Sequence, residues 1–273
     1  MDNQIDKFKE HLLINGRSYS TIKSYTGKVK EFLKTVGDSN LEDAFKEFVL
    51  KMRDNKKPAT INVYINAVKS YSEFLGVSIR VPDYAKLEKK LPDSFDEQFF
   101  EDEIVYIIEQ ISPEPIKMKA ILYFLYYSGL RIGELDLIKR KDFDLDNNTV
   151  RVYISKTREE RIVYYPDKVK DILKLFFDLE PEDSNAFNMS SLQIQNYFYT
   201  LKPHFKDINF RPHLFRHSYA TTLIRRGMNL ATVSKLLGHH NIQSTMKYIG
   251  LSSDEEKEDF LNIWKKKDKP RSI

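Results

Sequence analysis

The sequence contains no cysteine among its 273 residues. Disulfide bonds, thiolate nucleophiles and cysteine-ligated zinc or iron–sulfur sites are therefore excluded. It also lacks any apolar run long enough to cross a bilayer, and its first residues, MDNQIDKFKE, are charged where a secretory signal would be apolar. We expect a cytoplasmic protein without a membrane partner, whose chemistry relies on other side chains.

Acidic residues are missing from one long segment near the C-terminus. No Asp or Glu occurs from Ile208 to Ser253, although this segment holds six Lys or Arg residues and four of the six histidines. The net charge is only +4, and residues 1–92 carry 17 basic against 12 acidic residues. The acid-free segment and the basic N-terminal third both predict an anionic partner.

The remaining composition, 41% hydrophobic and 31% charged, is that of a globular protein of one or two domains. Apolar residues at helical spacing predict four short helices in the first 75 residues, one of them beginning at Pro58. Periodicity is lost between Gly76 and Gln98, where Pro82 and Pro92 also occur. We therefore predict a helical domain over residues 1–76, an interdomain linker over 77–98 and a second domain over 99–273.

The second domain reads as helices with a small antiparallel sheet. Helices are predicted over 103–111 and 116–128, with a stop at Gly129 and a short helix over 132–138. The stretches TVRVYIS (149–155) and RIVYY (161–165) are the predicted strands, and helices follow them. The fold class is thus mainly α, with a helical first domain and an α+β second domain.

Five short motifs invite a chemical interpretation, and each has an ordinary structural alternative. Arg131 in SGLRIGEL suits a phosphate at a helix junction, or a simple pairing with Glu134. Lys156 in ISKTREER, at a hairpin tip, suits proton donation or plain solvation. His213 and Arg216 in RPHLFRHS lie one helical turn apart after Pro212 and lack the carboxylate or third ligand of a metal site.

The last two motifs lie in LLGHHNIQSTMKYIG. His239 follows the helix-ending Gly238, and a loop histidine is often inert; Tyr248 is either packing or a nucleophile. Together the two arginines, the lysine, the two histidines and the tyrosine meet the needs of metal-free phosphodiester transesterification. Cationic donors offset charge on the phosphorus, and a tyrosine in an acid-free setting is more easily deprotonated.

In order and spacing, these motifs resemble those of the tyrosine recombinase (integrase) family, above all the short Xer-type recombinases. The resemblance extends over nearly the whole chain and implies a core-binding domain followed by a catalytic domain. It assigns catalytic roles to Arg131, Lys156, His213, Arg216, His239 and the nucleophile Tyr248, with a supporting role for Glu134.

The resemblance also implies a site-specific recombinase that needs neither metal nor ATP and forms a 3′-phosphotyrosyl intermediate on double-stranded DNA. It implies a homotetramer on two DNA sites, in chromosome or plasmid dimer resolution or in integration of a mobile element. Phe260, Leu261 and Trp264 then suggest a C-terminal docking helix over about 254–268, in its own protomer or a neighbour. A relaxing enzyme like type IB topoisomerases and a catalytically silent DNA-binding regulator remain as alternatives.

Overall fold

The computed structural model describes residues 2–37, 39–86, 93–154, 159–179, 181–182 and 185–238. The chain forms two compact units, Met1–Lys89 and Lys90–Ile273. Within the described ranges, no helix has both the length and the apolar character needed to cross a membrane. Each unit has its own hydrophobic core, so each is described by itself.

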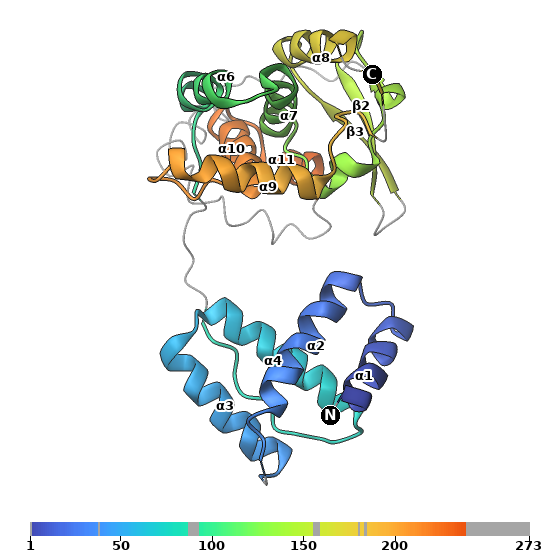
Figure 1. Cartoon of the computed structure of the whole chain (residues 1–273), viewed down its shortest axis with the longest axis vertical. Helices are drawn as coiled ribbons and strands as arrows, with labels where there is room; N and C mark the ends of the chain where they lie inside the picture. The colour runs from blue at the N-terminus through green and yellow to red at the C-terminus, as the bar shows by residue number, and fades with distance from the viewer. Residues whose placement is uncertain are drawn as a thin grey trace, which may run out of the picture. The chain divides into compact units, whose positions relative to one another are not determined.

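The first unit consists of the four helices expected from the sequence (Figure 1). They are α1 (Asp2–Ile14), α2 (Tyr19–Leu33), α3 (Leu41–Asn55) and α4 (Pro58–Phe74). Ser18 and Asn40 accept hydrogen bonds from backbone amides in the first turns of α2 and α3, and Pro58 opens α4. α4 packs against the other three helices and buries aromatic and aliphatic side chains such as Tyr71 and Ile65.

The segment predicted as a linker is divided between the two units. Ile79, Val81 and Ala85 pack on the core of the first unit. The Asn62 side chain donates to the carbonyl of Ala85 at 3.0 Å and accepts from its amide at 2.7 Å. Toward the other end, Phe95 is buried in the second unit. Extended segments without helical periodicity can thus still pack, because alternate apolar side chains reach a neighbouring core.

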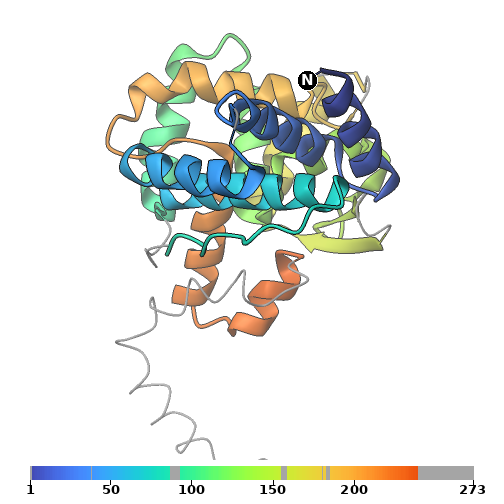
Figure 2. The same cartoon turned by 90° about the horizontal axis from the view of Figure 1, so that it is seen from below.

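The second unit is built mainly from helices around α7 (Pro115–Ser128). The helix expected over 103–111 begins earlier, as α5 (Glu97–Phe99), η1 (Phe100–Val105) and α6 (Tyr106–Ile111), because Asp96 caps its start. The other helical elements are η2 (Ile132–Leu137), η3 (Arg140–Asp142), α8 (Asp167–Leu179), α9 (Ser191–Leu201), η4 (Lys202–His204), α10 (Pro212–Arg225) and α11 (Leu230–Leu236). α7 contacts both α8 and α10. α10 also contacts α11, and Figure 2 shows these two helices, in orange, side by side.

A three-stranded antiparallel sheet accompanies these helices. Its order is β1 (Phe143–Asp144), β2 (Thr149–Ile154) and β3 (Glu159–Tyr164), and Arg161 pairs with Val152. The two longer strands were expected, whereas β1 is too short to leave a pattern in the sequence. The mainly α fold with a small antiparallel sheet is confirmed.

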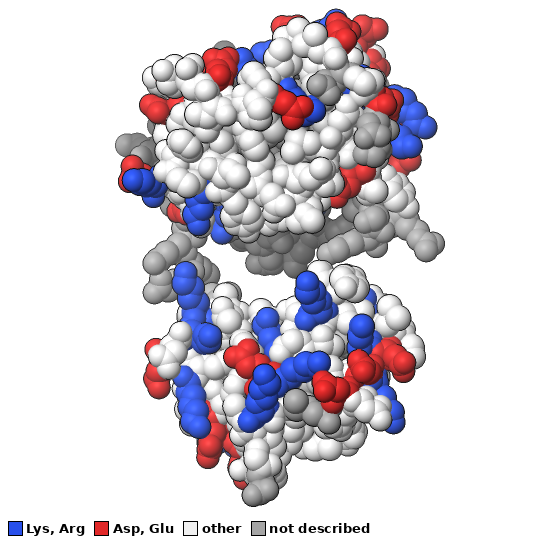
Figure 3. Space-filling view, viewed as in Figure 1, with Lys and Arg blue, Asp and Glu red and all other residues white. Residues whose placement is uncertain are grey.

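Charged side chains are unevenly spread over the face seen in Figure 3. Lys and Arg side chains are distributed across the first unit, whereas the middle of the second unit is nearly without described charged side chains. Asp and Glu side chains lie among these cations on the first unit, whose residues 1–92 carry 17 basic against 12 acidic residues.

Candidate active site

The first arginine motif lies at the turn between α7 and η2. α7 ends at Gly129, whose φ of +62° favours glycine, and Leu130 is buried. Arg131 follows with its side chain 40% exposed. Its backbone amide donates to Glu134 Oε2 at 2.8 Å, and its Nη1 lies 3.3 Å from Oε1 of the same carboxylate. The predicted position of Arg131 at a helix junction and its pairing with Glu134 are both present.

The second arginine motif opens α10. Pro212 is the first helical residue, His213 is exposed in the first turn, and Arg216 is only 5% exposed. Arg216 donates from Nη1 to the carbonyl of Gly129 and from Nη2 to that of Leu237, each at 2.6 Å. One buried guanidinium thereby joins the turn before Arg131 to the end of α11.

A third arginine, Arg161 on β3, was not singled out from the sequence. Its side chain is 12% exposed and donates to Glu134 Oε2 and to the carbonyl of Leu236, both at 3.0 Å. The strand pattern contained a signal: alternation places Arg161 on the same face as the buried Val163 and Tyr165. An arginine on the inward face of a strand needs a partner, and here that partner is Glu134.

Among the residues that the structure describes, this cluster is net positive, since Arg131, Arg161 and Arg216 converge with one carboxylate, that of Glu134. Burial lowers the pKa of Arg161 from its ordinary value, while Glu134 opposes that shift. The Glu134 carboxylate, 10% exposed, is used entirely within the cluster. The arrangement can therefore offer cationic hydrogen-bond donors to an anion without a buried carboxylate left to repel it.

Tyr219 on α10 adjoins the same cluster but is suited to packing. Its ring lies against Gly129, where a Cβ atom would approach within 2.7 Å of Cε1. Burial raises the pKa of Tyr219 to about 12, although Arg161 and Arg216 lower it. A phenol held neutral in this way is a poor nucleophile.

Of the predicted site residues, the structure brings together Arg131, Glu134 and Arg216, with His213 one turn before Arg216. Lys156, His239 and Tyr248, together with the predicted tail helix over 254–268, lie outside the described residues. In the sequence, Lys156 falls between β2 and β3, and His239 directly follows Gly238, which ends α11 with a φ of +63°.

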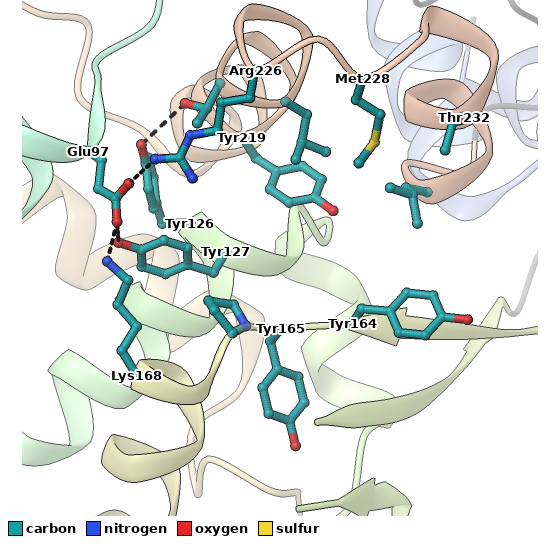
Figure 4. A pocket seen from close by; sticks show the side chains of 14 residues that line it. Glu97, Tyr126, Tyr127, Tyr164, Tyr165, Lys168, Tyr219, Arg226, Met228 and Thr232 are labelled. Atoms are coloured by element: carbon teal, nitrogen blue, oxygen red, sulfur yellow. Dashed lines mark hydrogen bonds and ion pairs between the residues drawn. The ribbon is translucent and has the colours of Figure 1, made fainter. Parts of the chain in front are cut away.

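A cavity of about 520 Å³ lies in the same unit, beside α10, α11 and the end of β3 (Figure 4). Its wall is largely apolar and aromatic, and Tyr126, Tyr164, Tyr219, Met228 and Leu236 contribute to it. On one side the Glu97 carboxylate accepts from Lys168, Tyr127 and Arg226. The lining includes none of Arg131, Arg161, His213 or Arg216, but Tyr219 and Leu236 border both this cavity and the arginine cluster.

Known proteins share both the sequence pattern and the fold. The model of the phage integrase family matches residues 97–255, more than half of the chain. A tyrosine recombinase of Thermosipho africanus is 32% identical over 280 residues, covering 94% of this chain and 98% of that protein. The tyrosine recombinase XerA of Saccharolobus solfataricus is 31% identical, covering 93% and 90% respectively.

Solved structures agree at the level of the fold. The Tn1549 transposon integrase in complex with transposon right end DNA superposes with a TM-score of 0.73 at 16% identity, covering 95% of this chain and 99% of that one. A lambda integrase dimer bound to a core site superposes with a TM-score of 0.71 at 17% identity, covering 91% of this chain and 94% of that one. The chain therefore belongs to the phage integrase family. It is a tyrosine recombinase, an enzyme that transfers DNA strands in site-specific recombination.

Proposed function

We propose that Tyr248 is the nucleophile of this recombinase and that Arg131, Lys156, His213, Arg216 and His239 assist it. The observation that most directly supports these roles is the bond from Arg216 to the carbonyl of Gly129. It joins α10, which carries His213 in its first turn, to the turn that carries Arg131. Two motifs 85 residues apart, at Arg131 and Arg216, thus contribute to one cationic cluster.

In the proposed reaction, the Tyr248 oxygen attacks the scissile phosphorus and forms a 3′-phosphotyrosyl bond. The bond from phosphorus to the 5′ oxygen breaks, and Lys156 donates the proton that turns this oxygen into a hydroxyl. A 5′-hydroxyl from the partner strand then attacks the phosphotyrosine and reverses the step, so the number of phosphodiester bonds is conserved. Arg131, Arg216 and the histidines stabilise the five-coordinate phosphorus and assist proton transfer.

The energetic problem is the ionisation of Tyr248. A phenol with a pKa of about 10 costs about 4 kcal/mol to ionise at pH 7. The acid-free segment from Ile208 to Ser253 lowers this cost, because it supplies cations and no competing carboxylate. Glu134 is the acid that joins the described cluster, and it is already paired with Arg131 and Arg161.

We further propose that double-stranded DNA is the partner and that both units bind it. The helical domain over residues 1–76 supplies lysines for the phosphates, residues 77–98 connect the domains, and residues 99–273 supply the chemistry. The Lys and Arg side chains exposed on the first unit support this division, because phosphate contacts set the position of a protein on a duplex. Since DNA is the substrate, we expect the enzyme to act in the cytoplasm.

The assembly that we propose is a homotetramer on two DNA sites, with the predicted C-terminal helix docked in it. The solved lambda integrase tetramer is bound to a Holliday junction. Relatives named XerA and XerC favour chromosome or plasmid dimer resolution as the biological role, and the transposon integrase favours mobile-element integration.

Covalent trapping tests the proposed chemistry. The purified full-length protein is mixed with fragmented DNA of its source in EDTA and stopped with SDS, and the protein-bound DNA ends are sequenced. We expect adducts at one sequence that disappear with Tyr248→Phe and persist with Tyr219→Phe. Scattered adducts would favour a topoisomerase-like relaxing enzyme, whereas DNA binding without adducts would favour a silent regulator.

A further inference from the structure

Arg161 connects three elements that are distant in the sequence. It lies on β3, its Nη2 donates to Oε2 of Glu134 in η2, and its Nη1 donates to the carbonyl of Leu236 at the end of α11. Glu134 in turn accepts from the backbone amide of Arg131. A single side chain therefore links the turn that carries Arg131 to the last turn of α11.

The end of α11 depends on two guanidinium groups. The last carbonyls of a helix have no intrahelical donor, and cations are favourable beside them. Here Leu236 accepts from Arg161 at 3.0 Å and Leu237 accepts from Arg216 at 2.6 Å. Consecutive carbonyls are thus held by arginines from two different elements, β3 and α10.

Gly238 gives independent evidence of this close approach. It has a φ of +63°, and a Cβ atom at this position would lie 3.0 Å from Cζ of Arg161 and still closer to Nη1. Any side chain at position 238 would displace the guanidinium. The backbone just before His239 therefore passes directly against Arg161.

The contacts of Arg161 are not those expected of an arginine kept only for strand packing. Its Nε is buried and has no hydrogen-bond partner among the described residues. A buried guanidinium is costly, and an apolar side chain of similar volume often serves a core at least as well. What an apolar side chain cannot do is donate at once to the Glu134 carboxylate and to the Leu236 carbonyl.

We propose that Arg161 is a positioning residue for strand transfer. By holding the end of α11 against the Glu134 and Arg131 turn, it fixes where the segment that leads through His239 to Tyr248 begins. Arg161 itself does not contact the phosphate in this scheme. The inference rests on the proposed function, since it requires Tyr248 to be the nucleophile.

The test compares Arg161→Met and Arg161→Lys with Arg151→Met in the full-length protein at saturating DNA. Arg151 is a suitable control because it is exposed on the neighbouring strand β2. The rate of Tyr248 adduct formation is measured in a single turnover, with DNA affinity and thermal stability measured in parallel. Misplacement of a reacting group by about 1 Å can cost about 100-fold in rate. We therefore expect Arg161→Met to lower the rate of adduct formation by about 10- to 100-fold. DNA affinity should change less than about twofold, because phosphate contacts made elsewhere determine it.

Two further readouts separate positioning from other roles. Lysine can replace one of the two contacts, so Arg161→Lys should recover part of the lost rate. A substrate with a 5′-thiolate leaving group needs no proton donor. It should therefore restore the rate of adduct formation in Lys156→Ala but not in Arg161→Met. Rescue of Arg161→Met by this substrate would assign Arg161 to leaving-group chemistry instead.

The outcomes keep the two proposals distinguishable. If wild type forms Tyr248-dependent adducts and both Arg161 variants react at its rate, the positioning role is wrong and the proposed function stands. If Arg161→Met unfolds, Arg161→Lys tests the positioning role instead. Full activity of Arg161→Lys would show that the two guanidinium contacts are not needed, and the positioning role would be wrong. If wild type forms no adduct that depends on Tyr248, the proposed function fails and this inference fails with it.

Discussion

The ring of Tyr219 lies against the Cα of Gly129, so that a Cβ atom on Gly129 would approach within 2.7 Å of the Tyr219 Cε1. This contact joins α10 to the turn before Arg131, where Arg216 also donates to the Gly129 carbonyl. The positive φ of Gly129 ends α7 and aims the chain at Arg131. Both the positive φ of Gly129 and its lack of a side chain therefore shape the turn that leads to Arg131.

Gly129→Ala should consequently destabilise the second unit. The left-handed conformation costs an alanine about 1–2 kcal/mol, and the overpacking against Tyr219 typically adds about 1–3 kcal/mol. We expect a loss of about 2–5 kcal/mol in the free energy of unfolding, measured by urea denaturation. Gly133→Ala is the matched control, because nothing lies within 4 Å of a Cβ there. Equal stability of the two variants would contradict the contact with Tyr219.

The acid stability of the second unit should depend on Glu97. Burial by itself would raise the pKa of Glu97, but hydrogen bonds from Lys168, Tyr127 and Arg226 lower it from 4.5 to about 2. A carboxyl whose pKa is lower in the folded state than in the unfolded state stabilises the fold at any pH above its unfolded-state pKa. For Glu97 this contribution is lost as the pH falls from about 4.5 towards 2.

Melting temperatures between pH 6 and pH 2 test this dependence. The difference between wild type and Glu97→Gln should be largest at the upper end of the range and shrink on acidification, since glutamine does not titrate. Glu103→Gln, an exposed carboxylate of η1, serves as the control and should follow wild type. A difference in melting temperature between wild type and Glu97→Gln that stays constant at all pH values would contradict the lowered pKa of Glu97.

Two tyrosines of α4 should respond oppositely to removal of their hydroxyl groups. The Tyr71 hydroxyl is buried and has no hydrogen-bond partner among the described residues, whereas the Tyr64 hydroxyl donates to Glu31. Tyr71→Phe should leave stability unchanged or raise it, because an unpaired buried hydroxyl costs free energy. Tyr64→Phe should lower the free energy of unfolding by about 1.5–3 kcal/mol through loss of a bond to a charged acceptor. Chemical denaturation of the full chain provides both values, and a larger loss for Tyr71→Phe would contradict the assignment.

Chelation should not affect the proposed strand transfer. The proposed groups that stabilise the phosphorus are guanidinium and imidazole donors, and the nucleophile is a phenol, so no step requires a divalent cation. We expect the same rate of adduct formation in EDTA as in magnesium at matched ionic strength. A rate in EDTA reduced by more than about 10-fold, restored by magnesium alone, would show that the cationic donors are insufficient.

Removal of residues 254–273 should impair assembly more than folding. Phe260, Leu261 and Trp264 are predicted to form the apolar stripe of a docking helix. The truncated chain should keep its cooperative unfolding but lose tetramers on DNA, as measured by native mass spectrometry. Unchanged tetramer formation would refute the proposed role of the tail.

The sequence by itself determined most of the helices and the two longer strands, and it predicted which residues form the site. Helix ends at Gly129 and Gly238 and the start of α10 at Pro212 are local properties of the backbone, so they could be read directly. The family motifs likewise identified Arg131 and Arg216, because order and spacing along the chain are sufficient for that comparison.

Only the tertiary structure decided how these motifs are joined. Arg161 escaped notice because its partners, Glu134 and the Leu236 carbonyl, are distant in sequence and one of them is a backbone atom that no motif records. The packing of Ile79 and Val81 on the first unit was missed for the same reason, since an extended segment acquires its burial from a surface formed elsewhere. Local backbone preference is encoded residue by residue, whereas a buried cation is explained only by the groups that the fold brings around it.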